Sequence, residues 1–142
     1  MKKYTPVTSI IKKGKAAPCT AEPIDGSLAL GSGFAVNLKD HAYIELFVGD
    51  DCDVTIENCA DVSVYCDNNC RITITAYDDC DMEIFAENDC SITLNGSVRE
   101  SGRIVCGNNC SISCWGNVEI ESGAGCKIHC ADNCNNAECG CA

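Results

Sequence analysis

Residues 70–96 read CRITITAYDDCDMEIFAENDCSITLNG, a stretch in which a short unit begins with Cys and recurs every ten residues. Within each unit apolar side chains alternate with polar ones, which is the pattern of a β-strand that buries one face. The segments between the units are rich in Asp and Asn, residues that tolerate left-handed backbone angles and hydrogen-bond to nearby backbone groups. The stretch therefore predicts short strands joined by turns, with the even-numbered side chains facing a core.

The same unit recurs less regularly from residue 42 to residue 130. Two intervals depart from ten residues: Cys52 to Ala60 spans eight, and Cys110 to Gly116 spans six. Fifteen Cys in 142 residues would ordinarily indicate a disulfide scaffold. We expect no secretory leader, however, and the Cys that begin the units fall in the apolar column. We therefore interpret them as small, reduced core residues.

The parity of the apolar positions discriminates between topologies. Two-residue hairpin turns would pair even with odd positions and mix the two faces, whereas stacked coils keep like positions in register. We predict an all-β fold, a β-solenoid with about ten residues per strand and two strands per coil. This arrangement places Cys70, Cys90 and Cys110 in one column. The alternative is an antiparallel meander, in a sandwich or an intertwined β oligomer.

Charge divides the chain into two parts. Five Lys and no acidic residue fall within the first 21 residues, so this segment carries +5, and the other 121 residues carry −16 of the net charge of −11. We expect an extended, Pro-containing anchoring arm over residues 1–40, a β-repeat body over 41–134 and a Cys-rich tail over 135–142. The arm is expected to bind other structural proteins of an assembly. Its anchoring residues are Lys2, Lys3, Lys12, Lys13 and Lys15.

The sequence offers little that indicates catalysis. It has two His, no spacing typical of a Ser-His-Asp or Cys-His site, and no Gly-rich phosphate loop. We therefore expect no catalytic residues, no cofactor and no enzyme activity. Thiolate and imidazole are zinc ligands. However, the Cys spacing in the C-terminal segment does not match the paired CxxC motifs of zinc knuckles, and we expect no metal there. The metal candidates in this segment are Cys126, His129, Cys130 and Cys134.

Two resemblances follow from these patterns. Residues 52–54 (CDV), 60–62 (ADV) and 80–82 (CDM) resemble the pentapeptide-repeat motif, although the period here is ten. Some proteins of that family are acidic rods that mimic DNA and bind topoisomerases. The whole chain, a basic arm followed by a compact β-repeat, resembles small virion proteins of tailed bacteriophages, such as head fibres and decoration proteins. That resemblance implies an arm that docks on the particle.

The leading hypothesis is a non-enzymatic structural or assembly protein, a phage-type virion component that is made in the host cytoplasm and forms homo-oligomers. One alternative is an acidic solenoid that sequesters a DNA-binding partner, and another is a thiol-rich metal-binding protein. The alternative location is the cytoplasm. The acidic body argues against nucleic acid as a partner, and no stretch is apolar for long enough to predict a membrane partner.

Overall fold

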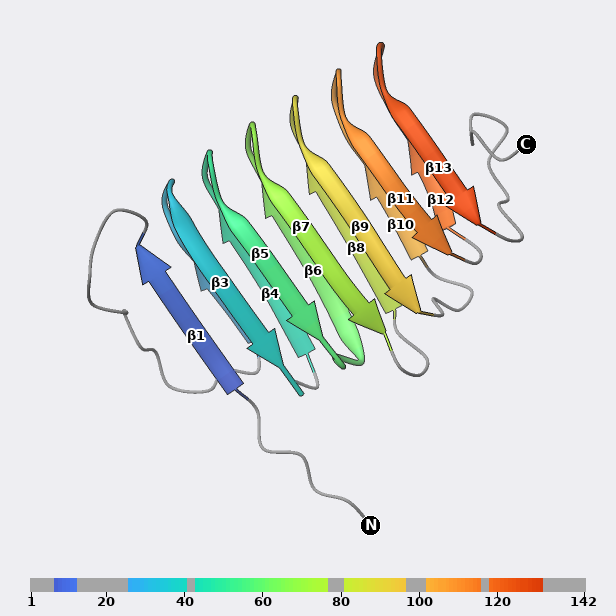
Figure 1. Ribbon diagram of the computed structural model, residues 1–142. Coiled ribbons are helices and arrows are strands. Elements are labelled where there is room, and N and C mark those ends of the chain that lie inside the picture. The colour runs from blue at the N-terminus through green and yellow to red at the C-terminus, as the bar shows by residue number, and fades with distance from the viewer. Residues whose placement is uncertain are drawn as a thin grey trace.

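The computed structural model describes residues 7–12, 26–40, 43–76, 81–96, 102–115 and 118–131. All regular structure in these segments is β-strand, and Figure 1 shows the strands stacked along one axis in two layers. The strands are β1 (Val7–Lys12), β2 (Gly26–Ala29), β3 (Phe34–Lys39), β4 (Tyr43–Val48), β5 (Asp53–Glu57), β6 (Asp61–Cys66), β7 (Arg71–Ala76), β8 (Asp81–Ala86), β9 (Ser91–Gly96), β10 (Gly102–Val105), β11 (Ser111–Trp115), β12 (Val118–Glu121) and β13 (Lys127–Ala131).

The chain alternates between two sheets. Sheet A has the order β1-β3-β5-β7-β9-β11-β13, and sheet B has the order β12-β10-β8-β6-β4-β2. All pairings except β1 with β3 are parallel and keep like positions opposite each other, so that Val54 pairs with Ile72 and Ile72 with Ile92. The fold is a β-solenoid of about five turns. This confirms the predicted fold class and excludes the antiparallel meander.

An antiparallel strand covers the N-terminal edge of sheet A. β1 pairs with β3 along its whole length, from Val7 opposite Lys39 to Lys12 opposite Phe34. β2 and β3 already belong to the stack, because they pair in parallel with β4 and β5. The coils therefore begin within the range 1–40 that the sequence assigned to the arm. Residues 26–39 keep the apolar alternation but lack the Cys that marks later units, so the repeat was not recognised there.

One corner of every coil, where the chain passes from sheet B to sheet A, has a constant form. The corner has three residues, and the third adopts a left-handed backbone. Its φ is near 60° at Asp51, Asn69, Asp89 and Asn109. In the outer coils the third residue is a glycine with positive φ, Gly33 or Gly125. These are the residue types that enter this region at lowest cost. The Asp- and Asn-rich segments at these four positions are therefore turns, as predicted, while residues 77–80 lie outside the described residues.

A ladder of hydrogen bonds joins these corners along the stack. The Asn68 backbone N–H donates to Asp50 Oδ1 (2.8 Å), the Asn88 N–H to Asn68 Oδ1 (3.0 Å) and the Asn108 N–H to Asn88 Oδ1 (2.7 Å). The ladder ends where the Ala124 N–H donates to Asn108 Oδ1 at 2.8 Å. Each side chain thus satisfies a backbone donor that the turn leaves outside the strand pairing.

The opposite corner varies in length. Register partners lie 18 residues apart between β4 and β6, 20 apart between β6 and β8, and 16 apart between β10 and β12. Because the first corner keeps its form, the second corner absorbs these differences. The irregular intervals after Cys52 and after Cys110 therefore mark changes in this corner and leave the strand register intact.

The core is a thin layer of stacked side chains between the sheets. Apart from Cys59, every buried hydrophobic side chain of the described segments has an even number, which confirms the predicted alternation. Cys52, Cys70, Cys90 and Cys110 are at most 2% exposed and follow the constant corner in successive coils. Their interpretation as core residues is thus confirmed, while Cys80 lies outside the described residues.

A charge placed in this core tests the alternation. Cys90→Asp should lower the free energy of unfolding by about 2–4 kcal/mol, because it would bury a carboxylate between coils without a partner. Ser91→Asp, one position further along and exposed, should change it by less than about 0.5 kcal/mol. Urea unfolding of both variants measures the two values, and equal losses would contradict the assignment of faces.

A second pair of substitutions tests the left-handed corner. Asp89 has φ = 59°, a conformation that costs roughly 1–2 kcal/mol for residues with a bulky Cβ. Asp89→Val should therefore lower the midpoint of thermal unfolding, whereas Asp89→Gly should leave it nearly unchanged. If Val and Gly had the same effect, backbone conformation would not be what selects the corner residue.

Candidate functional site: an aromatic ladder beside two thiol clusters

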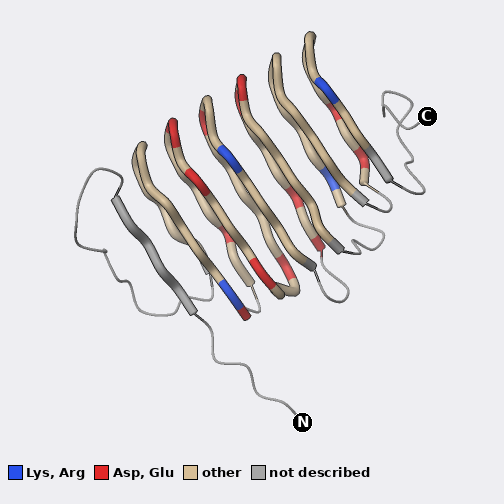
Figure 2. Tube along the Cα trace, in the orientation of Figure 1, with Lys and Arg blue, Asp and Glu red and all other residues tan. Residues whose placement is uncertain are grey.

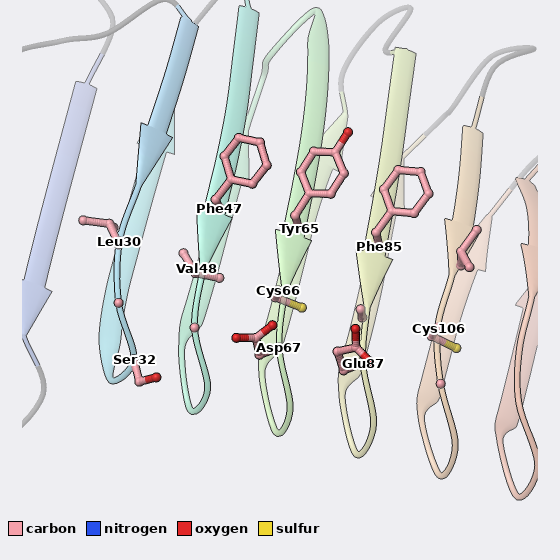
Figure 3. A pocket seen from close by; sticks show the side chains of 15 residues that line it. Leu30, Ser32, Phe47, Val48, Tyr65, Cys66, Asp67, Phe85, Glu87 and Cys106 are labelled. Atoms are coloured by element: carbon pink, nitrogen blue, oxygen red, sulfur yellow. The ribbon is translucent and has the colours of Figure 1, made fainter.

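Three aromatic rings stack on the outer face of sheet B. Phe47, Tyr65 and Phe85 are register partners in β4, β6 and β8. The ring centroids of Phe47 and Tyr65 are 4.7 Å apart and those of Tyr65 and Phe85 are 5.0 Å apart, with interplanar angles of 8° and 6°. These spacings follow the separation of neighbouring strands, about 4.8 Å. The three residues are referred to as the aromatic ladder, and Figure 3 shows their rings on one side of the sheet.

A groove of ≈770 Å³ runs along the aromatic ladder toward the constant corner. The rings form its apolar part, and Asp67 and Glu87 contribute carboxylates where the strands end, as Figure 3 shows. Phe47 is 39% exposed, because it lies at an outward position of β4. The groove therefore offers an aromatic surface and negative charge side by side.

Further acidic residues flank the ladder on the same face. Glu45 and Glu83 lie in one column of outward positions, and Asp61 pairs with Asp81 in another. The Glu45 carboxylate is the main reason why the pKa of Tyr43 is raised above its usual value. Figure 2 shows acidic residues in most coils of the described body and few basic ones. The outer face of sheet B is thus suited to a cationic partner.

Inside the solenoid, Cys side chains form a continuous column beside the constant corner. We refer to Cys52, Cys70, Cys90, Cys110 and Cys126 as the thiol column. Its thiols donate to backbone carbonyl oxygens of the preceding coil: Cys70 Sγ lies 3.1 Å from Gly49 O, and Cys90 Sγ lies 3.2 Å from Asp67 O. These bonds use carbonyl oxygens of the constant corner, several of which also accept a backbone N–H from the next coil.

Two Cys at the ends of sheet B strands approach this column. Cys66 meets Cys70 and Cys90 in the first thiol cluster, and Cys106 meets Cys110 and Cys126 in the second. Within each cluster the sulfur atoms lie within 4.8 Å of one another. The six residues are not joined in disulfides, and all but the half-buried Cys126 are buried. The sulfurs are therefore close enough to share protons or a bound ion.

Hydrogen bonds divide the protons of the first cluster unequally. The pKa of Cys90 is lowered, because the Cys66 and Cys70 thiols donate to its sulfur. The pKa of Cys66 is raised, chiefly by its bond to Cys70 and further by its bond to Cys90 and by burial. In the second cluster burial is the main reason that the pKa of Cys106 is raised. Cys90 is therefore the thiol of the first cluster that loses its proton most readily, and thiolate is the form that binds metals.

The structure does not bring the predicted metal candidates together as one set. Cys126 belongs to the second thiol cluster, whereas His129 lies exposed on the outer face of sheet A, opposite Ser113 in register. The side chain of Cys130 and all of Cys134 lie outside the described residues. Of the predicted anchoring residues, Lys12 ends β1. The other four, in segments 1–6 and 13–25, also lie outside the described residues.

Neither the ladder nor the clusters was expected from the sequence, although signals for both are present. The ladder positions are separated by 18 and 20 residues, which are the coil lengths at those points. Cys66 precedes Cys70 by four residues, as Cys106 precedes Cys110. In the coil between these pairs, the register partner of Cys66 is Ala86.

No family model, no curated protein and no solved structure matches the chain. The fold and the site themselves define a class: an acidic parallel β-solenoid with an aromatic ladder outside and thiol clusters inside. Within the part of the chain that the structure describes, no helix is long and apolar enough to cross a membrane.

The stacking of the ladder should be measurable as stability. Tyr65 stacks on a ring at each side, so Tyr65→Ala should lower the free energy of unfolding by about 1–3 kcal/mol, at about 0.5–1.5 kcal/mol per aromatic pair. Tyr43→Ala is the matched control, because Tyr43 is 40% exposed on the same sheet but lies outside the ladder. Chemical denaturation compares the two, and equal losses would show that the stacked geometry adds nothing.

Proposed function

We propose that the protein is a non-enzymatic structural component that assembles with copies of itself. In this proposal the basic N-terminal segment of one copy binds in the groove beside the aromatic ladder of another. The observation that carries it is the presence, in one chain, of an exposed acidic-aromatic groove and a segment of matching charge. A β-solenoid supports such a role, because its stacked coils give a stiff body whose outer columns repeat at the strand spacing.

The aromatic part of the groove favours a partner with apolar or aromatic groups. Phe47 is well exposed, and Tyr65 and Phe85 are only half-buried. Rows of exposed aromatic side chains are typical of interaction surfaces rather than of free solvent-facing strands. The N-terminal segment contains Tyr4 between its lysines, so it offers an aromatic ring together with its charge.

The charge of the groove favours the N-terminal segment of a second copy as its occupant. The first 21 residues carry +5, and the rest of the chain carries −16. Asp67 and Glu87 line the groove, and the carboxylates of Glu45 and Glu83 lie on the same outer face of sheet B. Opposite charges on two surfaces accelerate association and disfavour partners of the wrong sign. A second copy therefore has the chemistry that this groove recognises.

The phage-type virion setting stays a prediction that rests on the architectural resemblance. Within that setting, the same basic segment would bind either a neighbouring copy or an acidic surface of the particle. The groove proposal concerns the first of these contacts, which can be tested on the purified protein alone.

Sedimentation of the full-length chain at several salt concentrations tests the proposal. We expect association that weakens with salt, because charges beyond about 10 Å apart are screened at 0.1 M ionic strength. A quadruple arm variant (Lys2, Lys3, Lys13 and Lys15→Glu) leaves β1 unchanged. A groove variant (Asp67→Lys with Glu87→Lys) reverses the opposite surface. Each variant alone should associate at least tenfold more weakly than the wild type.

Mixing the two variants is the decisive measurement. The mixture should regain association, because the reversed arm of one copy then meets the reversed groove of the other. Arg71→Glu, exposed on sheet A, is the matched control and should associate like the wild type. A wild-type chain that stays monomeric at low salt, or a mixture that does not recover, would overturn the proposal. Salt-sensitive capture of a separate basic protein by a monomeric chain would instead support the sequestering alternative.

A further inference from the structure

We infer that the two thiol clusters are binding sites for a soft metal ion, and that the ion whose chemistry they match is Cu(I). The first site comprises Cys66, Cys70 and Cys90, and the second comprises Cys106, Cys110 and Cys126. Cys126 is the one residue that they share with the C-terminal metal candidates recognised in the sequence. The inference is independent of the assembly proposal.

The sulfur atoms already lie at distances that one ion can span. All three sulfurs of a cluster are within 4.8 Å of one another. With a metal–thiolate bond of about 2.3 Å, one ion places two sulfurs at most about 4.6 Å apart, or three sulfurs about 4.0 Å apart. Side-chain shifts of a few tenths of an ångström would therefore complete either site, with no change in the strand register.

The pattern of Cys along the stack indicates two separate sites rather than a general preference for small core residues. The thiol column has Cys in every coil from Cys52 to Cys126, so the column alone does not define a cluster. The clusters depend on the last inward position of the sheet B strands, which is Cys66, Ala86 and Cys106 in successive coils. Each column residue from Cys70 onward therefore belongs to one cluster, and Cys52 belongs to neither.

The donor set selects among metals. The clusters contain sulfur donors and no carboxylate or imidazole, so they lack the oxygen ligands that Ca²⁺ and Mg²⁺ require. Zinc sites are almost always tetrahedral with four ligands, whereas each cluster provides three protein ligands among the described residues. Soft thiolates suit Cu(I), zinc and iron–sulfur clusters. Iron–sulfur clusters, like structural zinc, use four protein ligands, whereas Cu(I) is satisfied by two or three sulfur ligands.

A route for the ion leads through the groove. Cys66 and Cys106 both line the groove beside the aromatic ladder, although each is nearly buried. Figure 3 shows both sulfur atoms at the strand ends, below the rings, with the strand of Phe85 between them. An ion that enters the groove would therefore meet one sulfur of each cluster first, and the thiol column would supply the other two.

The test is Cu(I) loading of the reduced, full-length protein without oxygen, in competition with a Cu(I) chelator of known affinity. Bound copper per chain is measured by atomic absorption. The variants are Cys66→Ala and Cys106→Ala, because Ala86 shows that the stack accommodates Ala at this position. Each should hold one copper ion at least tenfold more weakly than the wild type in the chelator competition, because two sulfurs remain at that site, and the double variant should hold two ions more weakly. Circular dichroism of each variant checks that the fold is retained, and Cys66→Ser and Cys106→Ser serve if Ala destabilises it.

Cys52→Ala is the matched control, since Cys52 is fully buried in the same column but outside both clusters. It should bind as much copper as the wild type, and comparing differences between variants removes any contribution from other Cys of the chain. Copper should also raise the unfolding temperature of the wild type more than that of the double variant. Equal binding by wild type and double variant, or an equal loss in Cys52→Ala, would overturn the two sites. Retention of Zn²⁺ in preference to Cu(I), when both are offered, would overturn the choice of ion.

Discussion

Parallel, in-register pairing between successive coils is the constraint on which the rest of the structure depends. It places each residue directly beside its equivalent in the next coil, at the strand separation of about 4.8 Å. Any side chain that recurs at the coil period therefore becomes a column. The Asp and Asn ladder at the corner, the stacked rings of Phe47, Tyr65 and Phe85, and the thiol column are three results of this one geometry. Their chemistry differs, but their spacing has the same origin.

The constraint also explains why one corner is uniform and the other is not. The constant corner carries the ladder of backbone N–H to side-chain hydrogen bonds, so a change of length there would break bonds in two neighbouring coils. The opposite corner accommodates coil lengths of 16, 18 and 20 residues while the strands on both sides stay in register. The uniform corner is therefore the one beside which the thiol column and both clusters can persist through successive coils.

The sequence was sufficient to predict the faces of the strands, the solenoid and the column of Cys70, Cys90 and Cys110, because each depends on local alternation and on a repeated period. The N-terminal strand was not predictable in this way. β1 lies outside the ten-residue pattern, and its antiparallel pairing with β3 is a long-range contact. The ladder was missed because its members sit at outward positions, where alternation places no demand on residue type. The clusters were missed because they join residues of both sheets, and the sequence does not show which corner brings Cys66 toward Cys70.

The groove and the thiol clusters meet at two residues, and this contact links the two proposed activities. Cys66 and Cys106 line the groove and also complete the clusters. A segment seated beside the aromatic ladder would cover the sulfurs through which an ion enters, so assembly would slow the exchange of metal in both directions. If bound metal changes the affinity of the groove for the segment, the bound segment changes the affinity of the clusters for metal by the same factor. A closely packed stack is suited to such coupling, because it transmits the displacement of one sulfur to the neighbouring strands.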